Sequence, residues 1–252
     1  MNSNLKKFRN IYIVAISVSL IFLLNGCFFS YREAATREDF RHFVEVGAQS
    51  EIPTKELRVN GRELYIANKI PLPALTTNLR LTNDFNLGLT ALVAPPYAGG
   101  GGIEPRLNLL EEKYNKPALM MYGNIHMYHA KIPADTVNSM DVNQLRAGLI
   151  IGKTIHNTSF NIGYHGYLES RKQKDSYLDE TWIVQGFCSS HGPDIYIGLK
   201  PWGRYRFCFN GEYNYQMWSL KNMNPSMTYS HRENRSDFKF GISLQIRLGS
   251  VY

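Results

Sequence analysis

The C-terminal stretch, residues 238–252, constrains the fold more than any other part of the chain. Large apolar side chains occupy alternate positions there: Phe238, Phe240, Ile242, Leu244, Ile246, Leu248 and Tyr252. Polar or charged side chains stand between them, at Lys239, Ser243, Gln245 and Arg247. Because successive side chains of a strand point to opposite faces, this order predicts an extended strand with one apolar and one polar face.

This strand also carries a resemblance to a known class of proteins. A final alternating strand that ends on an aromatic residue, here Tyr252, resembles the C-terminal assembly signal of bacterial outer-membrane β-barrels. The resemblance implies that the barrel-assembly machinery recognises this strand and that outer-membrane lipids surround the folded chain. A half-buried strand of a soluble protein alternates in the same way, so the rest of the chain has to decide between them.

The N-terminus predicts a secretory signal. Basic residues at positions 6, 7 and 9 precede an apolar run over residues 11–24, which is too short to cross a bilayer comfortably as a helix. The run ends in Leu24, Asn25, Gly26 and Cys27, which resembles the lipobox of bacterial lipoproteins. That resemblance implies cleavage before Cys27 and attachment of acyl chains such as palmitate to this residue. An ordinary signal peptide without lipidation is the alternative.

These features divide the chain into a lipoprotein signal peptide over residues 1–26, a lipidated tether over 27–39 and a barrel over 40–252. Phe28 stands where lipoproteins kept at the inner membrane carry aspartate, which resembles lipoproteins sent on to the outer membrane. Loss of the signal lowers the formal net charge from +7 to +4, because it removes three basic residues and no acidic one. Such an excess does not predict nucleic-acid binding, which would need a clustered basic face.

The segments that follow predict about ten strands, near residues 40–48, 70–82, 85–94, 103–111, 118–130, 143–153, 159–169, 181–199, 204–218 and 237–249. The links after odd-numbered strands are long, at 49–69, 95–102, 131–142, 170–180 and 219–236. The other links are short, at 83–84, 112–117, 154–158 and 200–203. Long outer loops and short periplasmic turns are typical of outer-membrane barrels, and an even strand count places both termini in the periplasm.

Two features leave the strand count open. His191 to Asp194 interrupts the eighth predicted strand and could be a bulge or the turn of an extra hairpin. Asn60 and Gly61 are typical of a two-residue hairpin turn, which we place in the first outer loop. The glycines of residues 99–102 indicate a flexible outer loop. The predicted fold is therefore an all-β, closed, antiparallel transmembrane barrel of about ten strands, within a range of 8–12.

The polar faces of these strands carry too many charges for the core of a soluble sandwich. They predict a charge network inside the barrel lumen, formed by Arg80, Glu104, Arg106, Arg146, Glu169, Arg204, Arg206, Glu212, Lys239 and Arg247. The interior of a barrel of about ten strands is narrow, so paired charges would fill it. A narrow channel or an anion site, favoured by the arginine excess, is the alternative.

The sequence predicts no catalytic residue, no metal site and no cofactor. His126 and His129 are three positions apart and so point to opposite faces of a strand, and the histidines at 156, 165 and 191 are interpreted as structural or rim residues. The His-x-Ser motif of outer-membrane esterases and lipid A deacylases is absent. Cys188 and Cys208 do not lie opposite each other in either hairpin register, which favours free thiols while leaving a disulfide open.

Together these patterns predict a lipid-anchored outer-membrane barrel that is not an enzyme. Its role would be structural, or the display of outer loops to an extracellular partner, with residues 219–236 as the most promising loop. Three alternatives remain: a small-solute or anion channel, a lipid-modifying outer-membrane enzyme, and a periplasmic lipoprotein that folds as a soluble lipocalin-like barrel.

Overall fold

The computed structural model describes residues 32, 34, 42–53, 58–59, 62–63, 74–94, 98–114, 116–131, 137–177, 180–199, 201–224 and 227–248. The predicted signal peptide, the lipidation site Cys27 and the terminal Tyr252 lie outside the described residues. Within these ranges, no helix has the length and apolar character needed to cross a membrane.

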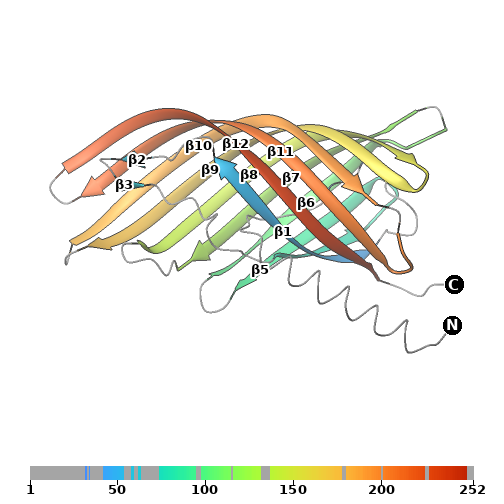
Figure 1. The fold of residues 1–252 in the computed structure, drawn as a ribbon, viewed down its shortest axis with the longest axis horizontal. Helices are drawn as coiled ribbons and strands as arrows, with labels where there is room; N and C mark the ends of the chain where they lie inside the picture. Colours follow the sequence, from blue (N-terminus) through green and yellow to red (C-terminus); the bar gives the residue numbers. More distant parts are fainter. Residues whose placement is uncertain are drawn as a thin grey trace.

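The described chain is all-β. Its strands are β1 (Phe43–Pro53), β2 (Arg58–Val59), β3 (Arg62–Glu63), β4 (Ala74–Arg80), β5 (Phe85–Ala94), β6 (Ala98–Leu110), β7 (Ala118–Ala130), β8 (Val137–Ile155), β9 (Thr158–Tyr177), β10 (Glu180–Gly198), β11 (Tyr205–Asn224) and β12 (Met227–Arg247). Ten of these form a closed antiparallel ring in chain order, sealed where β1 pairs with both β4 and β12 (Figure 1). The predicted closed barrel of about ten strands is confirmed.

Neither open feature of the sequence adds a strand pair to the ring. The strands β2 and β3 form a separate two-stranded antiparallel sheet, and β2 contacts β11. β10 runs unbroken through His191 to Asp194, and all its residues lie opposite residues of β9. Its pairing with β11 omits Gly192 and Pro193 and then resumes in the same register. Proline has no N–H to donate, which accounts for the gap in pairing. Because the register is the same on both sides of the gap, the strand contains no bulge there.

The two rims of the barrel differ. One rim, here called the turn end, holds the connections after β4, β6, β8 and β10. Among them is the two-residue turn His156-Asn157, where both residues have positive φ as a type I′ hairpin requires. The opposite rim is called the extended end. Beyond the first loop, the prediction of long loops at this rim is wrong. The strands there are joined by residues 95–97, 131–136, 178–179 and 225–226 only.

Most residues that were predicted to form the long loops belong to strands instead. β8 to β12 contain 19 to 21 residues each, about twice the 9–11 that cross a bilayer. In Figure 1 they continue as a curved wall well beyond the tip of β1. Outward positions on this wall turn polar, as at Lys172, Lys174 and Lys221. The hydrophobic alternation therefore stops while the hydrogen-bonded pairing continues, which is why the sequence pattern underestimated the strands.

The glycines at residues 99–102 also belong to a strand, so the predicted flexible loop is wrong. Gly102 in β6 lies opposite His126 in β7. A Cβ atom at Gly102 would lie 1.7 Å from the His126 Cδ2 atom. Glycine at this position therefore leaves the space that the buried His126 ring occupies.

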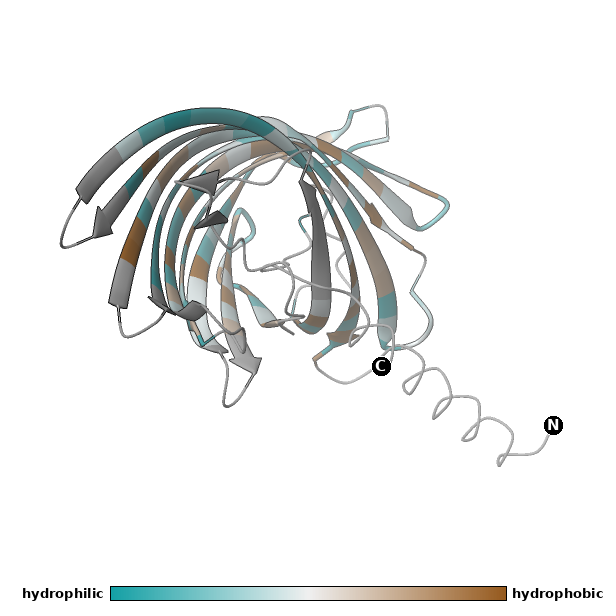
Figure 2. Ribbon diagram, turned by 60° about the vertical axis from the view of Figure 1, so that its left-hand side comes forward, coloured by the Kyte–Doolittle hydropathy of each residue, from teal (hydrophilic) through white to brown (hydrophobic). Residues whose placement is uncertain are grey.

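Side-chain direction identifies the environment of the barrel. Outward apolar residues such as Leu149, Ile162 and Phe240 are about half exposed, at 49%, 60% and 51%. Inward positions carry buried charged and amide side chains, and the alternation of the two kinds is visible along the strands in Figure 2. Water would not tolerate so continuous an apolar exterior, whereas hydrocarbon covers it favourably. A lipocalin-like barrel would have the opposite polarity, so that alternative is contradicted.

Candidate functional site

The centre of the lumen is organised around Arg32, which precedes the first strand. Its guanidinium group donates two hydrogen bonds to Glu104 Oε2, at 3.0 and 2.7 Å, and one to the Tyr196 hydroxyl at 2.9 Å. It also lies 3.8 Å from Glu212 and 4.3 Å from the centroid of the Tyr122 ring. These partners come from β6, β7, β10 and β11, so one buried arginine bridges the lumen between strands far apart in the ring.

A second buried arginine completes this central cluster. Arg146 donates to Glu212 Oε2 at 3.0 Å, to Asp194 Oδ2 at 3.3 Å and to the Tyr122 hydroxyl at 3.1 Å. Arg106 donates to Glu104 Oε1 at 2.8 Å. The cluster thus opposes three guanidinium groups with three carboxylates, all buried. Charges withdrawn from water are tolerated when they are paired and hydrogen-bonded in this way.

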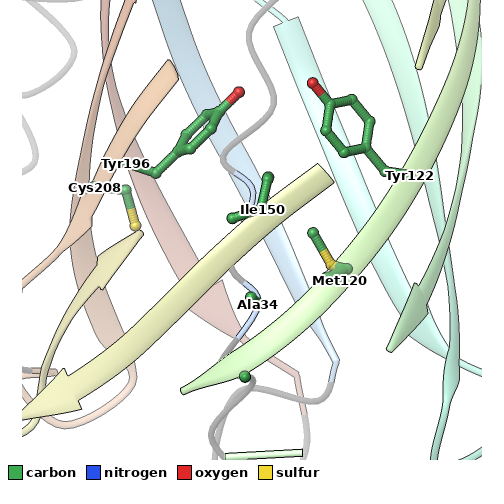
Figure 3. Packing of buried hydrophobic residues seen from close by; sticks show 7 residues of the cluster. Ala34, Met120, Tyr122, Ile150, Tyr196 and Cys208 are labelled. Atoms are coloured by element: carbon green, nitrogen blue, oxygen red, sulfur yellow. The ribbon is translucent and has the colours of Figure 1, made fainter. Parts of the chain in front are cut away.

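Towards the turn end, the central cluster rests on a small apolar layer made by Ala34, Ala118, Met120, Tyr122, Ile150, Tyr196 and Cys208. Figure 3 shows Ala34 inside the barrel, with the hydroxyls of Tyr122 and Tyr196 directed towards the same region of the lumen. The Ala34 N–H donates to Asn161 Oδ1 at 3.0 Å. Ala34 and Arg32 therefore both lie within the ring of strands.

Towards the extended end lies a second group, the distal cluster: Tyr167, Glu169, Arg171, Gln216, Trp218, Arg235, Asp237 and Lys239. The Gln216 amide donates to the Tyr167 hydroxyl at 2.6 Å, and Trp218 Nε1 donates to Gln216 at 2.8 Å. Arg171 and Arg235 lie 5.3 and 5.8 Å from the Trp218 ring. Cation–π contacts and hydrogen bonds together fill this part of the lumen.

A chain of hydrogen bonds joins the two clusters. His165 Nδ1 is hydrogen-bonded to Asp194, and its Nε2 lies 2.6 Å from Asn214 Oδ1. Asn214 in turn donates to Asp237 at 2.7 Å. Polar contacts thus run from the Arg32 region to the distal cluster, and a connected polar network of this kind fixes a unique packing.

The residues that the sequence assigned to the lumen network fall into two groups. Six lie buried in the clusters described above: Glu104, Arg106, Arg146, Glu169, Glu212 and Lys239. Glu169 bonds to Arg171 and to Gln144, the latter at 3.1 Å. Lys239 lies 5.2 Å from the Tyr167 ring.

The other four lie near the turn end, away from these carboxylates. Arg206 is buried, but it donates to Ser159 and to the backbone carbonyls of Gly198 and Leu199. Arg80 bonds to the turn formed by Thr82 and Asn83. Arg204 is exposed, and Arg247 is only partly buried. Strand alternation correctly selects a face, but near a rim the same face opens to solvent, which is why Arg80 and Arg204 lie outside the network.

Several members of the clusters were missed. Arg171 and Arg235 continue the inward alternation of their strands, so longer predicted strands would have included them. Asp237 began the last predicted strand and was not assigned to the lumen network. Asp194 was hidden by the apparent interruption at Gly192 and Pro193. No local pattern could place Arg32, because it precedes the first strand and was assigned to the tether.

The two histidines that stand three positions apart lie on opposite faces of β7. His126 is buried and His129 exposed, as the predicted opposite faces require. No group of three potential metal ligands occurs among the described residues. No disulfide joins Cys188 and Cys208, which lie opposite Trp218 and Gly198 respectively in the described β10–β11 pairing.

Comparison with known proteins finds only distant similarity. No protein-family model matches the chain, and no curated protein matches it. Among solved structures, the outer-membrane protease OmpT from Escherichia coli is 10% identical, with a TM-score of 0.47 over 88% of this chain and 99% of that one. The outer-membrane protein AlkL is 11% identical, with a TM-score of 0.32 over 90% and 100%. The monoaromatic hydrocarbon channel CymD is 9% identical, with a TM-score of 0.26 over 86% and 90%.

Ten antiparallel strands close a ring, the outer surface is apolar, and buried ion pairs occupy the centre. The chain is a β-barrel of the outer-membrane type whose interior is packed with paired polar side chains.

Proposed function

We propose that this chain is a lipid-anchored outer-membrane barrel with a closed lumen and a structural or surface-binding role. The observation that carries the proposal is the placement of Arg32. It ties β6, β7, β10 and β11 together across the lumen with every cation–carboxylate distance below 4 Å. An ion entering this region would have to separate buried ion pairs, and separating such pairs is costly.

The proposal includes an orientation and an anchor. The turn end faces the periplasm and the extended end faces the exterior, because β1 begins and β12 ends at the turn end, the side on which the proposed anchor holds the chain. Cys27 carries the acyl chains and holds the N-terminus at the periplasmic surface. The wall formed by β8 to β12 then stands outside the cell and supplies the surface for binding.

Catalysis is not part of the proposal. The His165–Asp194 pair has the composition of a general base held by a carboxylate. Both side chains, however, have 0% exposed surface, and both ring nitrogens already face hydrogen-bond partners. A substrate could not reach either group while the lumen stays filled.

Conductance in planar bilayers tests the closed lumen. The purified full-length protein should insert and give no unitary current steps in 1 M salt, because ion pairs between buried side chains are screened little by bulk ions. An Arg204→Ala variant should behave identically, since this exposed side chain lies outside the clusters. Stable, anion-selective current steps from the unmodified protein would instead establish the channel alternative.

A further inference from the structure

Four cationic side chains gather on the outer surface of the projecting wall. Lys172 and Lys174 lie on β9, Lys221 on β11 and Arg232 on β12, and all four are exposed. Lys172 and Lys221 both lie opposite Gln185 of β10, so they share one row, two strands apart. Neighbouring strands are about 4.8 Å apart, which separates their backbones by roughly 10 Å. We call these four residues the basic patch.

The fourth member continues the patch towards the turn end. Arg232 lies opposite Ser219, two residues from Lys221 on the same face of β11. Lys174 lies two residues beyond Lys172 on the same face of β9. The four cations therefore occupy three successive outward rows, close enough for one headgroup with two anionic groups to contact several of them.

The basic patch borders the apolar belt directly. Phe187, 51% exposed, lies two residues from Gln185 on the same outward face of β10. Leu168 and Met217 lie one row nearer the turn end, at 45% and 44% exposed. Beyond them comes an outward aromatic group in which Tyr164 is hydrogen-bonded to His191 at 2.7 Å. The basic patch therefore stands at the extended-end edge of the outward apolar residues.

The charge of the basic patch is not neutralised by the described part of the chain. No hydrogen bond or ion pair joins any of the four cations to a described carboxylate. Asp141 lies opposite Lys172 on β8, but its carboxylate is 2.7 Å from His129 Nδ1. Cations near an anionic lipid surface are attracted to it and strengthen binding. Four exposed cations beside an apolar belt are complementary to an amphiphile that carries phosphate.

We propose that the basic patch binds the phosphate groups of the phosphorylated glycolipid of the outer leaflet. The acyl chains of that lipid would lie against Phe187, Leu168 and Met217, and its phosphates would lie between Lys172, Lys221 and Arg232. This assignment rests on the proposed orientation, which places the extended end outside the cell.

The test measures lipid binding to the full-length protein in nanodiscs. The probes are bisphosphorylated lipid A, its dephosphorylated form and phosphatidylglycerol. The patch variant carries Lys172→Gln, Lys174→Gln, Lys221→Gln and Arg232→Gln. The control variant carries Lys113→Gln and Lys116→Gln, which remove exposed charges at the turn end.

Bisphosphorylated lipid A should bind the unmodified protein and the control at least tenfold more tightly than it binds the patch variant. Removal of its phosphates should abolish that difference. Equal binding by the patch variant, or equal binding of the dephosphorylated lipid, would overturn the proposal. Equal preference for phosphatidylglycerol would overturn it in favour of a general anionic surface. Because the nanodisc assay needs no orientation, its failure is distinguishable from failure of the proposed topology, which labelling of intact cells reports separately.

Discussion

Replacement of Arg32 tests the central feature of this barrel. In the Arg32→Ala variant, Glu104 loses its two hydrogen bonds from the guanidinium, and Glu212 loses a cation at 3.8 Å. Breaking a buried ion pair by removing one partner costs about 3–5 kcal/mol. Glu104 keeps Arg106 at 2.8 Å and Asn124 at 3.1 Å, and Glu212 keeps Arg146 at 3.0 Å. We therefore expect the free energy of unfolding to fall by about 3 kcal/mol, the lower part of that range.

Equilibrium unfolding by guanidinium chloride in phospholipid vesicles measures this loss. The exposed Arg204→Ala is the matched control, with an expected change within about 0.5 kcal/mol. A double-mutant cycle with Glu104→Gln isolates the pair and should give a coupling free energy of about 1–3 kcal/mol. An Arg32→Ala variant as stable as the unmodified protein, or a coupling free energy near zero, would refute the reasoning that the ion pairs of Arg32 stabilise the barrel.

Three further predictions follow from other parts of the chain. Gly102→Ala should lower the free energy of unfolding by about 1–3 kcal/mol, because the new Cβ collides with His126, whereas Gly99→Ala, with nothing within 4 Å, should cost less than half as much in the same vesicle titration. Metabolic labelling with palmitate should mark the full-length protein but not Cys27→Ser; equal labelling of both would contradict the anchor. Lys174→Cys should react with an impermeant maleimide on intact cells, whereas reaction only after the outer membrane is permeabilised would reverse the orientation.

Strand alternation accounts for most of what could be predicted. Along β8, Leu145, Leu149 and Ile151 are exposed while Arg146 is buried, as the pattern indicated. The pattern works because a strand places alternate residues on opposite faces whatever the neighbouring strand is. It failed beyond the apolar belt, where the outward side chains become polar and the residues of the wall were interpreted as loops.

The central cluster could be predicted only in part, for a related reason. Glu104, Arg146 and Glu212 were assigned to the lumen from their own strands, but their partners could not be identified. Asp194 lies next to a proline in a segment that locally is typical of a turn, and its pairing with β9 and β11 shows that the strand continues.

The sequence by itself determined the period of two, the polarity of the two faces and the approximate number of strands, because these follow from neighbouring residues and the geometry of an extended chain. Only the tertiary structure decided that Arg32 lies in the lumen and that β1 closes the ring against β12. Both depend on contacts between residues separated by many tens of positions, such as Arg32 with Tyr196 and Phe43 with Arg247. No local pattern records such contacts, because their stability comes from pairing across the barrel.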